Sequence, residues 1–306
     1  MDQEQKKSLP LVIVLIIGAI AIVAAGFMLV EKKKSTLPEV SDISTSTIIT
    51  SDDTEPSNIS TVGHSVEGRV IESYSFGTGD TTLLFVGGIH GGYEWNSTLL
   101  AYQFIDELET DRIKVPDTLK IEIIPALNPD GLYKIVGKEG RFTAQDVISS
   151  DVNVIATGRF NANNVDLNRN FDCKWKPTST WRGKEVDAGD NAFSEPEAAA
   201  LRNFVEKTDP AAVVFWHSQA NAVYASECEN GILPETLSLM NTYANAALYK
   251  SVDSFDAYPI SGDAEGWLAS IGIPAITVEL SSREGMDWSK NKKGFEAVVG
   301  LYSIAR

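Results

Sequence analysis

The chain has 306 residues, of which 43% are hydrophobic and 22% are charged, a composition that excludes wholesale disorder and a multi-pass membrane protein. Its length suffices for one large domain or two small ones. The formal net charge is -16, and this acidity argues against nucleic acid as a partner, because nucleic-acid-binding proteins need a basic surface that displaces counterions.

The N-terminal 30 residues have the pattern of a membrane anchor. A short tail, residues 1–10, precedes residues 11–30, which contain no charged side chain. A helix of this length would extend about 30 Å, enough to cross the hydrocarbon core of a bilayer. A cleaved signal peptide is the alternative, but its apolar region usually has about 7–15 residues. We therefore expect one uncleaved transmembrane helix at 11–30.

A linker, residues 31–62, follows the expected span. Between residues 35 and 62, 13 of 28 residues are Ser or Thr, and five are acidic with no basic side chain. Such a segment cannot bury enough apolar surface to fold. Stalks of this composition are common outside the cytoplasm, which favours that location for the C-terminal part. The positive-inside rule does not decide the orientation of the span, because lysines lie on both sides of it. We expect a membrane-anchored, single-pass protein whose residues 63–306 form an extracytoplasmic domain.

Strand and helix patterns alternate through this domain. The first two strand-like runs, 69–76 and 81–86, are separated by Gly77-Thr78-Gly79-Asp80, which is typical of a hairpin turn. Further strand-like runs lie at 119–124, 211–216 and 275–280. Helical patterns lie at 94–109, 196–206, 233–249 and about 290–304. The alternation predicts a single-domain α/β fold whose mixed, largely parallel central sheet is flanked by helices.

Polar side chains come where the apolar runs end, and ligands of open α/β sheets collect beyond the carboxyl ends of the strands. His90 and His217 follow such runs, and Glu279 lies at the end of another. Two histidines and a carboxylate leave a fourth position on zinc for water, and glycines after His90 would let Glu94 turn back to the same metal. The alternative is two unrelated core histidines, with Glu94 favoured by a helix dipole. The two histidines together favour the metal.

Five segments in order resemble the motif set of the zinc metallocarboxypeptidases, the carboxypeptidase A-like peptidases, and in particular their compact bacterial members. They are GGIHGGYEWN, GRFNANNVDLNRNFD, FSEPEA, VVFWHSQ and YPISGDAEGWLASIGIPAITVEL. The resemblance covers about residues 65 to 304 and therefore excludes both the anchor and the linker. It implies a zinc carboxypeptidase-like catalytic domain with one Zn²⁺ ion, which hydrolyses the C-terminal peptide bond of peptides through a metal-activated water.

The resemblance also assigns roles around the metal. It implies that His90, Glu94 and His217 are the zinc ligands and that Glu279 is the general base. One departure is visible, because the family motif His-x-x-Glu is here His-x-x-x-Glu. We expect a rearranged turn that still delivers Glu94, since no other carboxylate lies nearer in the sequence.

Three further roles concern the substrate. The resemblance implies that Asn168 and Arg169 grip its terminal carboxylate and that Arg159 polarises the scissile carbonyl, with Arg141 as a weaker candidate. It implies that Tyr258 covers the bound substrate. The alternative for Arg169 is a structural ion pair with a neighbouring aspartate.

Asp263 and Glu265 lie where the family's selecting residue falls. An acidic pocket would favour a basic or amine-bearing terminal residue, whereas the alternative is that Asp263 caps the following helix. If the linker faces a cell wall, a peptidoglycan-derived stem peptide is a plausible substrate. Two other functions stay open: an amidase that deacylates N-acyl amino acids on the same fold, and a catalytically silent binding module on a membrane stalk.

Three local patterns have simpler structural interpretations. Cys173 and Cys228 permit one disulfide bond, although their spacing does not show that they pair. Ser194 and Glu197 have the spacing of a capping box at a helix start. Asn96-Ser97-Thr98 matches a glycosylation sequon, but a sugar so close to Glu94 is not expected.

Overall fold

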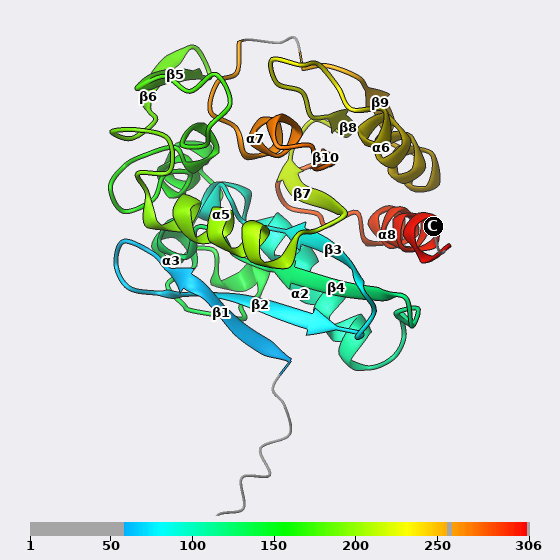
Figure 1. The fold of residues 1–306 in the computed structure, drawn as a ribbon. Coiled ribbons are helices and arrows are strands. Elements are labelled where there is room, and N and C mark those ends of the chain that lie inside the picture. Colours follow the sequence, from blue (N-terminus) through cyan, green and yellow to red (C-terminus); the bar gives the residue numbers. More distant parts are fainter. Residues whose placement is uncertain (1–57, 256–258, 305–306) are drawn as a thin grey trace, which may run out of the picture. The chain divides into compact units, whose positions relative to one another are not determined.

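The computed structural model describes residues 58–255 and 259–304 (Figure 1). The predicted transmembrane helix at 11–30, most of the predicted linker and Tyr258 lie outside these ranges. Within them, none of the helices combines the length and the apolar character that a bilayer-spanning helix needs. The first strand begins at Ile59 and ends at His64, so the folded part starts a few residues before the predicted boundary at 63.

An eight-stranded sheet has the order β1-β2-β4-β3-β7-β10-β8-β9. Its strands are β1 (Ile59–His64), β2 (Val70–Phe76), β3 (Thr81–Val86), β4 (Leu119–Ile124), β7 (Ala212–Ser218), β8 (Ala222–Ala225), β9 (Lys250–Val252) and β10 (Ala275–Leu280). The four central strands, β4, β3, β7 and β10, are mutually parallel, whereas β2 and β8 are antiparallel to their central neighbours. The predicted mixed, largely parallel sheet is therefore confirmed.

The predicted hairpin between the first two runs is wrong. β4 lies between β2 and β3, pairing antiparallel with β2 and parallel with β3. The physical reason is burial. β3 is buried over almost its whole length and gains a parallel partner on each edge, whereas β2 is only partly buried and lies nearer the edge of the sheet.

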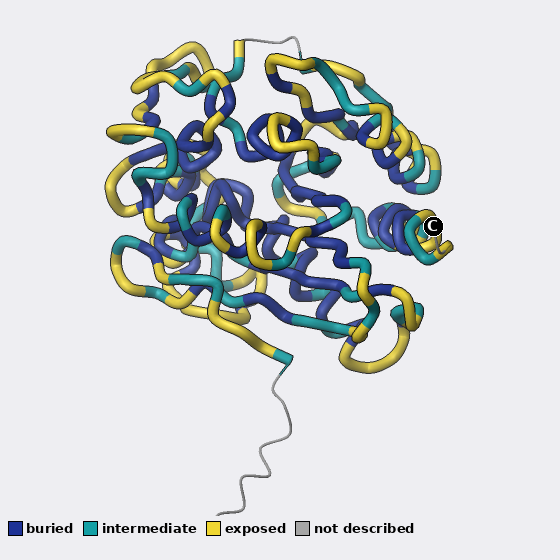
Figure 2. The backbone as a smooth tube through the Cα atoms, in the orientation of Figure 1, coloured by how far each residue is buried: buried dark blue, intermediate teal, exposed yellow. Residues whose placement is uncertain are grey.

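Helices cover both faces of the sheet (Figures 1 and 2). The α-helices of the described residues are α2 (Trp95–Glu109), α3 (Pro129–Val136), α4 (Val152–Ile155), α5 (Pro196–Thr208), α6 (Pro234–Ala247), α7 (Ala264–Ser270) and α8 (Trp288–Ser303). Leu83 and Phe85 of β3 pack in a core with α2, α6 and α8, while Leu84 and Val86 pack in a second core with α5 and α7. This alternation is the two-residue period of a strand covered on both faces. A separate hairpin joins β5 (Thr178–Trp181) to β6 (Lys184–Asp187).

Cys173 and Cys228 form a disulfide bond, with Cα atoms 6.0 Å apart. The bond joins the loop after Arg169 to the loop after β8. Both half-cystines are buried in the same core as Trp267 of α7. The pairing that the sequence left open is thus made, and it crosslinks two connections over 55 residues of chain.

Candidate functional site

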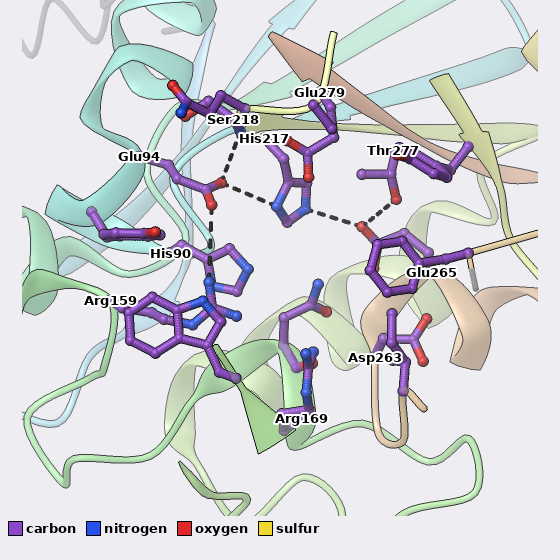
Figure 3. Close-up of a pocket in the computed structure, with 18 of the residues that line it drawn as sticks. His90, Glu94, Arg159, Arg169, His217, Ser218, Asp263, Glu265, Thr277 and Glu279 are labelled. Carbon is purple, nitrogen blue, oxygen red and sulfur yellow. Dashed lines mark hydrogen bonds and ion pairs between the residues drawn. The ribbon is translucent and has the colours of Figure 1, made fainter. Parts of the chain in front are cut away.

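Three buried side chains meet beyond the carboxyl ends of β3 and β7 (Figure 3). His90 follows β3, Glu94 ends a short 3-10 turn, and His217 lies on β7. One ligand atom from each residue lies within 4.8 Å of the others, and His217 Nδ1 is 3.1 Å from Glu94 Oε2. Because β3 and β7 are hydrogen-bonded parallel neighbours, their ends place the two imidazoles together.

The additional residue of the first motif is taken up by a turn. Gly91–Glu94 form a 3-10 helix, and Gly91 has a φ of +44°, which favours glycine. A Cβ at Gly91 would lie 2.6 Å from the carbonyl oxygen of Gly158, and one at Gly92 would collide with Ile135. The two glycines therefore let the chain turn tightly against α3, and Glu94 reaches His217 despite the longer spacing.

The donor set and its surroundings fit a divalent cation. His90 Nδ1 is buried and has no hydrogen-bond partner among the described residues. Burial and the nearby charge of Arg159 hold the pKa of His90 well below its ordinary value, so this imidazole is neutral, as a metal ligand must be. Burial opposes protonation of His217, yet hydrogen bonds to Glu265 and Glu94 raise its pKa well above the ordinary value. The carboxylates thus create a site that attracts positive charge.

Glu265 contacts the metal-site histidine directly, a contact that the sequence did not reveal. Its Oε1 atom lies 3.0 Å from His217 Nε2 and accepts a hydrogen bond of 2.9 Å from Thr277 Oγ1 (Figure 3). Metal-binding histidines usually donate their second ring N–H to a carboxylate, which fixes the tautomer and the ring orientation. Glu265 is therefore placed to orient His217, and not only to contact a substrate. The contact arises from the first turn of α7, far from His217 in sequence.

Glu279 lies opposite His217 in the register of β10 and β7. Figure 3 shows its carboxylate beside the His217 ring. Burial, reinforced by the negative charge of Glu94, raises the pKa of Glu279 to about 7. Its Oε2 atom is buried and has no hydrogen-bond partner within the described part of the chain. A carboxylate with one free oxygen beside a metal site is suited to accept a proton from water.

Of the two arginine candidates for the carbonyl, the structure brings Arg159 to the site. Its guanidinium is buried, donates a 2.8 Å hydrogen bond from Nε to Asp166 Oδ2, and lies 3.9 Å from Glu94 Oε1. Arg141 instead is exposed and pairs with Asp106 on α2 at 2.6 Å, away from the pocket. The Asp166 contact fixes the orientation of Arg159, leaving its remaining N–H groups toward the pocket.

Asn168 and Arg169 line the same pocket. Asn168 Oδ1 accepts a 2.8 Å hydrogen bond from the backbone N–H of Ala264, which anchors the loop to the start of α7. Arg169 is buried but forms no ion pair with any carboxylate of residues 58–255 or 259–304, and its Nε has no partner there. The alternative of a structural ion pair with Asp166 or Asp172 is therefore not what the structure shows.

Asp263 has the capping role that was the alternative to substrate selection. It is the N-cap of α7, and its side chain accepts a 2.7 Å hydrogen bond from Gly266 N–H. It also lines the pocket, where burial and the charge of Glu265 raise its pKa to about 6. The pocket that contains all these side chains has a volume of about 510 Å³. Tyr258 belongs to the residues outside the description, so its predicted role stays a prediction.

The other two local patterns have different outcomes. The predicted capping box is wrong, because Glu195 is the N-cap of α5, and Asn161 donates to buried Glu195 and Glu197. Asn96 of the sequon is fully buried; it donates hydrogen bonds of 2.8 Å to the carbonyls of Ser282 and Gly285. A glycan has no access to such a side chain.

Comparison with known proteins identifies the family. A zinc carboxypeptidase family model matches residues 49–298. The chain belongs to the zinc carboxypeptidase family. Members of this family use one zinc ion, and the His90–Glu94–His217 cluster is able to hold it.

Individual relatives of this chain are distant in sequence. It is 22% identical to gamma-D-glutamyl-L-diamino acid endopeptidase 1 of Lysinibacillus sphaericus over 240 residues, which are 72% of this chain and 60% of the relative. It is 30% identical to murein peptide amidase A of Escherichia coli K12 over 132 residues, a stretch that covers 40% of this chain and 51% of the relative. The crystal structure of murein-tripeptide amidase from Escherichia coli O157 shares the fold, with a TM-score of 0.57 and 24% identity, covering 82% of this chain and 94% of that one.

Proposed function

We propose that this chain is a zinc-dependent metallocarboxypeptidase that removes the C-terminal residue of peptides. The observation that carries the proposal is the placement of a buried arginine without an acid partner, Arg169, in the same pocket as the His90–Glu94–His217 cluster and Glu279. A planar guanidinium can donate two parallel hydrogen bonds to a carboxylate. A free peptide C-terminus is the ligand that satisfies this group.

The chemistry can be divided among the side chains of the pocket. Zinc, when bound, lowers the pKa of a water molecule and polarises a carbonyl oxygen. Glu279 takes the proton of the attacking water and delivers it to the leaving amine, so that the peptide bond breaks as the new carboxyl group forms. Arg159, oriented by Asp166, stabilises the negative charge that develops on the carbonyl oxygen. Arg169 and Asn168 hold the terminal carboxylate.

The proposed substrates are peptides derived from the cell wall. Two relatives are named for activity on murein peptides or on bonds to diamino acids, and this supports the same substrate class here. The chain spans about 60% and 51% of the length of these relatives. A membrane anchor at residues 11–30 with the domain outside the cytoplasm would place the enzyme beside this substrate.

A second candidate is hydrolysis of amide bonds in small N-acyl amino acids, which the relatives named as amidases favour. The same residues would act, because an amide and a peptide bond need the same water and base. A binding module without catalysis is disfavoured, since Glu279 keeps a free oxygen beside His217.

The test is the product profile of the purified protein. It is incubated with synthetic peptides, purified muropeptides and N-acyl amino acids, with and without a chelator, and the products are identified by mass spectrometry. We expect release of single C-terminal residues that stops with the chelator and returns with zinc. Hydrolysis of the small amides alone would replace the carboxypeptidase proposal with the amidase. No zinc-dependent hydrolysis of any substrate would overturn both.

A further inference from the structure

The pocket contains more positive charge than the proposed reaction uses. Four cationic side chains line it without forming an ion pair to any carboxylate of the described ranges: Arg169, Lys174, Arg182 and Arg283. By contrast, Arg159 in the same pocket is paired with Asp166. Arg169 has a role in the proposed reaction, but Arg283, which lines the same pocket, has none.

Arg283 is held in a defined position. Its guanidinium carbon lies 3.9 Å from the centre of the Tyr93 ring, and its Nη1 is 3.5 Å from the Tyr93 carbonyl oxygen. The loop that carries it is fixed by fully buried Asn96, which donates to the carbonyls of Ser282 and Gly285. Asn96 also accepts a 3.0 Å hydrogen bond from Ser218, the neighbour of His217. Through Asn96 the loop is thus attached to the start of α2, directly after Glu94, and to Ser218 of β7.

Arg283 and Arg169 belong to different sides of the metal cluster. Arg283 stacks on Tyr93, the residue next to Glu94. Arg283 and Glu279 line the same pocket. Asn168, the neighbour of Arg169, is hydrogen-bonded to the start of α7, and Figure 3 shows Arg169 with Asp263 at the side of the pocket away from Glu94.

A peptide bound by its terminal carboxylate at Arg169 would extend across the cluster toward Arg283. We infer that Arg283 binds a carboxylate on the acyl side of the scissile bond, so that the preferred substrates are peptides with an acidic residue directly before the released one. This inference rests on the proposed carboxypeptidase function. Asn168, Arg169 and Arg159 cannot select the penultimate side chain, because in the proposed reaction they contact the terminal carboxylate and the scissile carbonyl.

The test uses peptide pairs that differ only in the penultimate residue, glutamate against glutamine, with alanine or lysine released. Wild type is expected to favour the glutamate peptide in kcat/KM by about tenfold, the scale of one charge-assisted hydrogen bond. Arg283→Gln should remove this preference mainly through KM and leave the glutamine peptide within about twofold of wild type. Arg283→Lys should keep part of the preference. Arg141→Gln, which removes an equal charge outside the pocket, should keep all of it.

Two results would overturn the inference. One is a wild type that does not distinguish the paired peptides, and the other is an Arg283→Gln variant that loses activity on both peptides equally, which would assign Arg283 a structural role through Tyr93. Failure of the proposed function itself is a separate outcome, since wild type would then release no residue from either peptide in the presence of zinc.

Discussion

The polar side chains of the pocket form two groups that differ in their partners. In the first group, His217 contacts both Glu94 and Glu265, and Arg159 is paired with Asp166. In the second group, Arg169 and Arg283 have no acidic partner among the residues described, and Glu279 Oε2 has no hydrogen-bond partner there. Burying an unsatisfied polar group costs free energy, so an enzyme keeps such groups where a ligand satisfies them. The first group fits a fixed metal, and the second fits water and substrate.

The largest loss of activity is expected from replacing Glu279, the proposed general base in the second group. Glu279→Gln keeps the size of the side chain but removes its ability to accept a proton from water. We expect kcat to fall by about 10³-fold or more while zinc content stays unchanged, as determined by steady-state kinetics and metal analysis. A variant that retains more than about a tenth of wild-type kcat would remove Glu279 from the role of base.

The first group predicts a loss of metal affinity. Glu265→Gln weakens the hydrogen bond that orients His217, and we expect zinc affinity to fall by about 10–100-fold in a chelator competition assay. Glu227→Gln changes another acid of the pocket wall, one hydrogen-bonded to Ser254, and should leave the affinity unchanged. If Glu265→Gln instead alters only the ratio of lysine to alanine release, Glu265 reads the substrate and does not orient the histidine.

A third change separates substrate binding from chemistry. Arg169→Ala should raise KM for peptides with a free C-terminus by about 10–100-fold, because a charge-assisted hydrogen-bonding partner is lost. Thermal unfolding should show that the variant is folded. Equal losses on C-terminally amidated peptides would contradict the assignment, since these substrates carry no terminal carboxylate for Arg169 to bind.

The smallest expected effect concerns the scaffold. Replacing both Cys173 and Cys228 by serine removes a crosslink over 55 residues and should lower the free energy of unfolding by about 2–4 kcal/mol. Denaturant unfolding of the oxidised wild type and the variant measures the difference. An unchanged midpoint would mean that neighbouring contacts, such as those of Trp267, already hold the two loops together.

Much of this arrangement can be predicted from the sequence, because apolar runs mark buried strands and ligands collect where those strands end. His90, His217 and Glu279 are found in this way. The contact of Glu265 with His217 is not, since no local pattern shows that the first turn of α7 lies against β7. The burial of Asn96 could not be predicted either, because an asparagine that holds a loop from inside the fold has the same local sequence as one in a glycosylation sequon.

The wrong predictions share a physical cause. Gly77 and Gly79 indicate a tight turn, but pairing between β2 and β3 is overridden by the burial of β3 between two parallel strands. The capping box fails in the same manner, because Glu195 and Glu197 find buried partners such as Asn161 across the fold. Local signals are correct about where an element begins, whereas long-range contacts decide its neighbours.

The most direct test of the account is the zinc content of the purified protein and of variants at each proposed ligand. Elemental analysis after dialysis should find one zinc ion per wild-type chain. His90→Ala, Glu94→Ala and His217→Ala should each lose most of this metal while retaining wild-type secondary structure by circular dichroism. Full zinc occupancy in a folded Glu94→Ala variant, or in either histidine variant, would contradict the shared metal site on which the proposed chemistry depends.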